Sequence, residues 1–133
     1  MAKSRDKGKA GEREVVKLLR ELFDGYGFTI ERNLLSQARS GGVDVVGVPG
    51  LAIEVKRAET LRLAAWFEQT QEQARRLNAR PILFYRQSRH PWRIMTTIRD
   101  ATTGITATVV MEWPQARTLI RAWVEHTLEQ QCD

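Results

Sequence analysis

Two acids and a lysine stand inside two otherwise apolar segments, residues 43–48 and 51–57. Asp44 lies in the first segment, and Glu54 and Lys56 lie in the second. Charged groups in apolar strands are costly to bury unless something binds them. Carboxylate oxygens are the ligands that Mg²⁺ prefers, and a nearby lysine can orient a water or offset charge in a phosphoryl transition state. We therefore interpret this cluster as a metal-dependent phosphodiesterase site.

The two segments are predicted to be paired strands. Residues 43–48 are rich in β-branched residues, and Pro49-Gly50 supplies a tight turn. Residues 51–57 alternate with a period of two, so Glu54 and Lys56 share one face, opposite Leu51, Ile53 and Val55. Adjacent strands lie about 4.8 Å apart, so carboxylates on the two strands can converge on one ion.

A helix from roughly Lys9 to Phe23 is predicted upstream. Its apolar residues recur at helical spacing: Val15, Leu18, Leu19 and Leu22. Glu12 precedes this apolar stripe by one turn and projects along it. Alone, Glu12 is an ordinary first-turn acid, which also gains from the helix dipole. Its position relative to the later acids favours a functional role instead.

Composition limits the class of protein. A chain of 133 residues suits a single domain, 1–133, with its own core. The formal charge of +5 favours an acidic partner such as nucleic acid, although a solvated basic surface is the alternative. A single cysteine, Cys132, excludes an intrachain disulfide and a cysteine zinc cluster. No apolar run approaches the ~18–20 residues of a membrane span, so we expect a soluble, cytoplasmic protein with no membrane contact.

Several basic residues could meet phosphates. Residues 1–8 are predicted to be a flexible basic arm, with a frayed, solvated terminus as an equal alternative. Arg32 and Arg39 flank or lie in a polar, glycine-ended loop over residues 33–42. For both arginines, phosphate contacts and plain surface exposure remain open.

The remaining chain alternates helices and strands, which indicates an α/β (α+β) fold. A helix is predicted from Thr60 to about Asn78, with Trp66 and Phe67 in the core and four less buried polar residues: Gln69, Gln73, Arg75 and Arg76. Strands over residues 81–86, 92–99 and 105–113 follow. A last helix runs from Pro114 to about Gln130, and its broad apolar face suits core packing or a dimer contact.

The motifs carry a family resemblance. Asp44 followed by Ile53-Glu54-Val55-Lys56 resembles the signature of the PD-(D/E)XK nucleases, with Val43 where a proline usually stands. Gly11-Glu12-Arg13-Glu14 resembles the first-helix Glu-Arg motif of the archaeal and phage Holliday junction resolvases in that superfamily. The resemblance covers residues 8–57 well and residues 60–113 in general layout.

The resemblance implies a restriction-endonuclease-like core, a mixed central sheet flanked by helices, and a homodimer that places two sites on one four-way DNA junction. Glu12, Asp44 and Glu54 would hold Mg²⁺, for which Mn²⁺ can substitute, with the backbone carbonyl of Val55 as a further ligand. Lys56 would assist the attacking water. The residues expected to contact DNA are Lys7, Lys9, Arg13, Arg32, Arg39, Ser40 and Arg57.

The expected function is thus a metal-dependent, structure-specific endodeoxyribonuclease that resolves four-way junctions by paired symmetric nicks. Two alternatives remain open: a nuclease of the same superfamily that acts on other branched, nicked or flapped DNA, and a DNA-binding module that does not cleave. The compact architecture suggests a phage origin and hence the host cytoplasm, although no single residue shows it.

Overall fold

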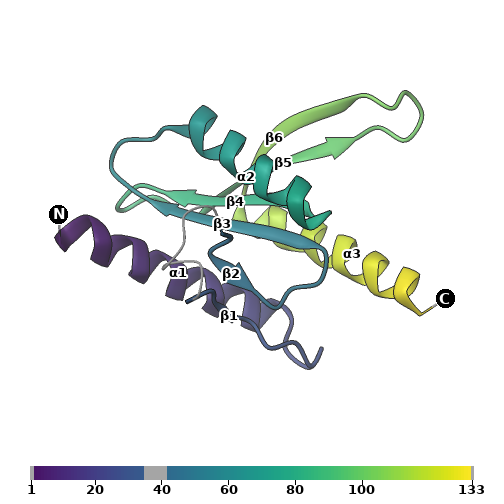
Figure 1. Cartoon of the computed structure of the whole chain (residues 1–133), viewed down its shortest axis with the longest axis horizontal. Coiled ribbons are helices and arrows are strands. Elements are labelled where there is room, and N and C mark those ends of the chain that lie inside the picture. Colours follow the sequence, from purple (N-terminus) through teal and green to yellow (C-terminus); the bar gives the residue numbers. More distant parts are fainter. Residues whose placement is uncertain (1, 35–41, 133) are drawn as a thin grey trace.

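The structure, a computed structural model, describes residues 2–34 and 42–132. In these residues, six strands form one sheet in the order β1-β2-β3-β4-β5-β6, and helices cover it (Figure 1). The helices are α1 (Ala2–Leu22), α2 (Leu63–Leu77) and α3 (Trp113–Gln131). The strands are β1 (Glu31–Arg32), β2 (Val45–Val46), β3 (Leu51–Arg57), β4 (Arg80–Arg86), β5 (Arg93–Arg99) and β6 (Thr106–Glu112).

Strands β3 and β4 run parallel, while the other neighbouring pairs are antiparallel. A parallel pair needs a crossover connection, and α2 supplies it between β3 and β4. The predicted mixed sheet of an α+β fold is therefore confirmed. None of the helices in the described ranges is both long and apolar enough to cross a membrane.

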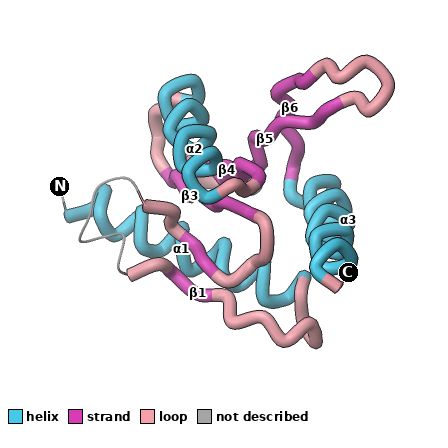
Figure 2. The backbone as a smooth tube through the Cα atoms, turned by 45° about the vertical axis from the view of Figure 1, so that its right-hand side comes forward, coloured by secondary structure: helices cyan, strands magenta, loops and turns pink. Residues whose placement is uncertain are grey.

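The sheet is covered on both faces. Helices α1 and α3 lie on one face and α2 lies on the other (Figures 1 and 2). On the first face, Ile53 and Val55 belong to a buried cluster with Leu19 of α1 and Ile120 of α3. On the second face, Ala52 packs near Ala74 of α2. Because side chains alternate along β3, Glu54 and Lys56 belong to the α2 side.

Strand β2 is shorter than the predicted strand over residues 43–48. At Gly47 the chain passes so close to Thr29 that an added Cβ would lie 1.8 Å from the Thr29 carbonyl oxygen, and φ is +105°. Only glycine tolerates this approach and this φ, and regular pairing ends before it. Asp44 nevertheless stays tied to β3, because its N–H donates to the carbonyl of Ile53 at 2.9 Å.

Helix α1 begins earlier than predicted. It is helical from Ala2, so the flexible arm expected over residues 1–8 is a wrong prediction for residues 2–8. Alanine, lysine and arginine are strong helix formers and extend the helix backwards. Its first turns are also anchored, because Lys7 Nζ lies 2.8 Å from Glu59 Oε1.

Candidate active site

Asp44 is clamped against β3 by two hydrogen bonds. Its main-chain N–H donates to the carbonyl of Ile53 at 2.9 Å, and its Oδ2 accepts from the Val55 N–H at 2.8 Å. The carboxylate therefore bridges to the strand at the residue that follows Glu54. In a strand the N–H and C=O of one residue point to the same edge, so the Val55 carbonyl also faces the β2 side.

Glu54 is the most deeply buried acid of the site, at 3% exposed. Its pKa is raised from the ordinary 4.5 to about 9, chiefly by burial and further by the charge of Asp44 and a hydrogen bond between the two carboxyl groups. Burial also raises the pKa of Asp44. Without a cation the two acids thus favour holding a proton between them.

Lys56 lies on the same face of β3 as Glu54 and is half-buried. Its positive charge lowers the pKa of both Asp44 and Glu54, which opposes the effect of burial. Lys56 is thus a positive charge on the same strand face as Glu54. A lysine in this position can orient a water or balance charge on a phosphate.

Glu12 of α1 forms an ion pair with Arg32. Its Oε1 lies 2.9 Å from Nε of Arg32, and the two side chains are only 12% and 16% exposed. Arg32 is on β1, paired with Val45 of β2. The negative charge of Glu12 contributes to the raised pKa of both Asp44 and Glu54. The role of Glu12 as a third ligand beside Asp44 and Glu54 stays a prediction.

Gly11 permits the close approach of α1 to β3. A Cβ added at Gly11 would lie 3.2 Å from Cβ of Arg57 and 3.5 Å from a methyl group of Val55. The contact with Arg57 is tight enough that its Cβ would have to move by a few tenths of an ångström, so glycine favours the close packing of α1 on β3. Glu12, the next residue, is thereby held beside the sheet. Sequence periodicity did not single out Gly11 for this role.

The carboxylate oxygens of Asp44 and Glu54 are the kind of ligand that a hard divalent cation prefers. Within residues 2–34 and 42–132, no three acidic, histidine or cysteine side chains converge closely enough to hold a metal ion as they stand. The Asp44–Glu54 pair still offers a buried oxygen, Glu54 Oε2, that has no hydrogen-bond partner among the described residues. A buried, unpaired carboxylate oxygen is costly, and a cation can satisfy it.

The residues predicted to contact DNA fall into four groups. Arg13 is exposed on α1 and Lys9 is half-buried there. Lys7 and Arg57 are engaged in ion pairs with Glu59 and Glu14. Arg32 is committed to Glu12, as described above. Arg39 and Ser40 lie outside the described residues.

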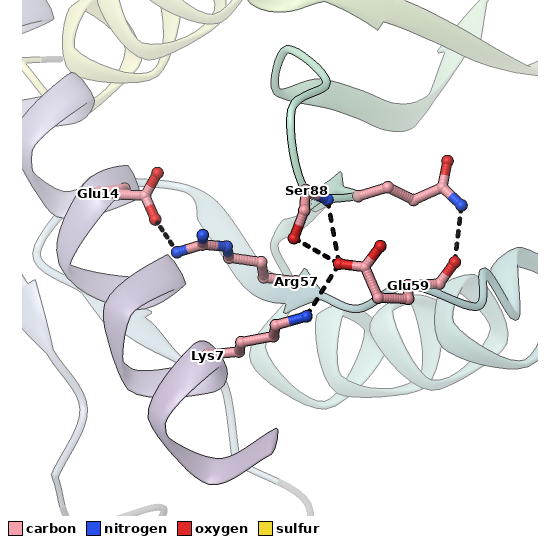
Figure 3. A network of polar contacts seen from close by, with 6 residues as sticks. Lys7, Glu14, Arg57, Glu59 and Ser88 are labelled. Carbon is pink, nitrogen blue, oxygen red and sulfur yellow. Dashed lines mark hydrogen bonds and ion pairs between the residues drawn. The ribbon is translucent and has the colours of Figure 1, made fainter. Parts of the chain in front are cut away.

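The two ion pairs belong to a network that joins three elements (Figure 3). Glu14 of α1 accepts from Arg57 at 2.9 Å and lies 3.4 Å from Nη1 of Arg86 on β4. Glu59, after β3, accepts from Lys7 and from the Ser88 hydroxyl. These contacts fasten α1 to the ends of β3 and β4. Arg57 therefore has a structural partner as well as its predicted place near DNA.

An open cavity of about 600 Å³ lies between α1 and β1, next to Arg32. Four basic residues and three acids contribute to its wall: Arg13, Lys17, Arg20, Arg32, Glu21, Asp24 and Glu31. Arg13 and Arg32 thus line one concave surface, and Arg32 also forms the ion pair with Glu12.

An aspartate directly before β2 and a glutamate on the adjacent β3, with a lysine two residues after the glutamate, form the arrangement of the PD-(D/E)XK nucleases that the sequence resembles. The chain belongs to the family described as phage putative PDDEXK endonuclease, which it matches over residues 3–131. The chain is accordingly a member of a phage endonuclease family.

A solved structure with a similar fold is that of Hjc, a Holliday junction resolvase from the archaeal hyperthermophile Archaeoglobus fulgidus. The TM-score is 0.55 at 24% sequence identity, and the likeness covers 84% of this chain and 96% of that chain. At this identity the likeness establishes the fold. Among curated proteins, none matches the chain.

One polar residue near the site was placed wrongly from the sequence. Gln73 was predicted to be among the less buried residues of its helix, but it is 4% exposed. Its neighbours Thr70 and Ala74 are buried as well, so the buried face of α2 is wider than the apolar residues alone indicate. A glutamine inside an otherwise mixed helical pattern carries no sequence signal for burial.

Proposed function

We propose that this protein is a metal-dependent endonuclease that resolves four-way DNA junctions by paired nicks. The observation that carries the proposal is the buried Asp44–Glu54 pair with one unpaired oxygen, in a chain of an endonuclease family. The likeness to a junction resolvase supports the choice of branched DNA as substrate. The net charge of +5 suits a nucleic acid partner.

Asp44, Glu54 and the Val55 carbonyl would hold Mg²⁺ or Mn²⁺. Such an ion supplies a Lewis acid and lowers the pKa of a water that attacks phosphorus. The metal replaces the proton of the acid pair, because carboxylates bind cations in their ionised form. Glu12 would complete the oxygen ligands, directly or through a water, once Arg32 shares its contacts with DNA.

The cationic groups have separate tasks. Lys56, beside the carboxylates, orients the attacking water and offsets the charge that builds up on the phosphate. Arg32 keeps Glu12 in place with Nε, while its Nη2 is buried and has no partner in the part of the chain that the structure describes. That nitrogen is suited to bind a nonbridging phosphate oxygen. Arg13 would contact the neighbouring phosphate along the cavity wall.

Paired nicks require two sites on one junction, so the proposal includes a homodimer. The test uses four-way junctions labelled on each strand in turn, with flap, nicked and plain duplexes of the same sequence beside them. Symmetric, Mg²⁺-dependent nicks on opposite strands of the junction are expected, and Glu54→Gln should produce none. Glu68→Gln, which alters an exposed glutamate of α2, is the matched control and should cut like the parent.

Each other result selects an alternative. Single cuts in flaps or nicked DNA without paired cuts in junctions would point to a nuclease for another branched substrate. Binding of branched DNA with no cleavage by any divalent metal would point to a non-cleaving module. Either result would refute junction resolution.

A further inference from the structure

The side chain of Gln73 presents a buried amide without a partner. It is 4% exposed, and neither Nε2 nor Oε1 has a hydrogen-bond partner among the described residues. Leaving buried donors and acceptors unpaired costs about 1–3 kcal/mol for each group. Such exceptions in a folded protein usually mark a functional role or a bound ligand.

The helix geometry shows which way this amide faces. Gln71 and Arg75 line a groove of about 380 Å³ together with Thr97 of β5 and Thr106 of β6. Side chains advance by about 100° per residue along a helix. Gln73 is therefore about 200° around α2 from Gln71, on the side of the helix that is turned away from β5 and β6 and towards β3.

The packing of Ala74, the residue after Gln73, shows how far along the strands this part of α2 lies. Ala74 belongs to a buried cluster with Val43 and Ala52. Val43 directly precedes Asp44, and Ala52 is two residues before Glu54 on the same face of β3. Gln73 is thus on the side of α2 that faces the acid pair, and near its level.

Glu54 and Gln73 therefore both bring an unpaired polar group to the α2 side of the sheet. We propose that Gln73 is a positioning residue of the metal site: its amide binds a water of the divalent cation held by Asp44 and Glu54 and so fixes the orientation of Glu54. An amide suits this task because it can donate to Glu54 and accept from a metal-bound water at the same time. The inference rests on the proposed metal-dependent function and adds a residue from a third element to the site.

The test measures Mn²⁺ binding rather than cleavage. Full-length wild type, Gln73→Leu and the matched control Gln71→Leu are titrated with Mn²⁺ by calorimetry, and their thermal unfolding is followed in chelator and in Mn²⁺. Loss of a group that supports metal ligands weakens metal affinity about 10–100-fold. We expect this loss in Gln73→Leu and an unchanged affinity in Gln71→Leu.

The metal-free melting temperature separates a functional role from a structural one. Removing an unpaired buried amide should leave the Tm of Gln73→Leu equal to or above that of the wild type, whereas a structural hydrogen bond would make the Tm fall. Gln73→Met, which is unbranched like glutamine, gives the same comparison if Gln73→Leu does not fold.

Mn²⁺ affinity within about twofold of the wild type in a folded Gln73 variant would overturn the inference and leave the proposed nuclease function intact. A lowered Tm with undiminished Mn²⁺ affinity would also overturn it. A wild type that neither binds Mn²⁺ nor cuts branched DNA would refute the proposed function and this inference together. Weaker Mn²⁺ binding at an unchanged or raised Tm would support it.

Discussion

Replacing Glu54 by glutamine should stabilise the metal-free protein, and increasingly so as pH rises. Glutamine has nearly the shape of a protonated glutamate and keeps a donor for Asp44. The pKa of Glu54 rises from 4.5 to about 9 on folding. A carboxyl group with a raised folded pKa contributes its full stability below pH 4.5, and that contribution is lost as pH rises towards 9.

The size of the effect follows from the same linkage. Between the two pKa values the wild type loses about 1.4 kcal/mol per pH unit from this group. Glu54→Gln has no such loss, so its advantage over the wild type should be about 3 kcal/mol larger at pH 8 than at pH 6. For a chain of this size that corresponds to a change in the Tm difference of about 10 °C.

Urea unfolding in chelator at pH 6, 7 and 8 measures this advantage. The exposed-residue variant Glu68→Gln should show a constant difference from the wild type over the same range. An advantage of Glu54→Gln that is equal at pH 6 and pH 8 would refute the burial argument. Adding Mg²⁺ should stabilise the wild type at pH 8 and leave Glu54→Gln nearly unaffected, since the metal replaces the proton of the acid pair.

Three further predictions concern the acid pair and the residues around it. Asp44→Asn and Glu54→Gln should abolish cleavage yet keep junction affinity, measured by gel shift without metal, because neither adds a charge that repels phosphate, and Asp44→Asn should tighten it where it removes the negative charge left on the acid pair; equal loss of binding and cleavage would contradict this. Arg32→Ala should destabilise the protein by about 1–3 kcal/mol in urea unfolding, because it leaves the half-buried Glu12 without this partner, whereas Arg32→Ala combined with Glu12→Gln should recover part of that loss. Gly11→Val should lower cleavage without removing any charged group, because its side chain would push α1 away from β3; an unchanged rate would mean that the helix position is not critical.

The alternating pattern of residues along β3 was sufficient to predict which face of the strand carries Glu54 and Lys56. Strict alternation assigned Glu54 and Lys56 to one face and Ile53 to the other, and the core confirms it, since Ile53 packs with α1 and Ala52 with α2. The turn after β2 was similarly readable from Pro49-Gly50. Both features depend on residues that are close together in the sequence, so the local sequence pattern is enough to predict them.

The contacts that the sequence did not reveal join distant residues. The Glu12–Arg32 pair depends on how β1 passes α1, which no period encodes. Burial of Gln73 depends on the packing of α2 over two strands, and the polar side chain argued against it. The early start of α1 was missed because glycine at position 8 and a run of basic residues suggest a frayed end, whereas the anchor, Glu59, is remote in sequence.

Charge balance links the metal to the substrate. Around the site stand three acids, Glu12, Asp44 and Glu54, and two cations, Arg32 and Lys56, which leave one negative charge when all are ionised. A shared proton on the acid pair cancels that charge in the metal-free protein, in keeping with the raised pKa values. A divalent cation in place of the proton makes the site positive by one charge, which matches a phosphodiester. Metal binding and phosphate binding should therefore favour each other, because the metal turns a neutral site into one that attracts phosphate.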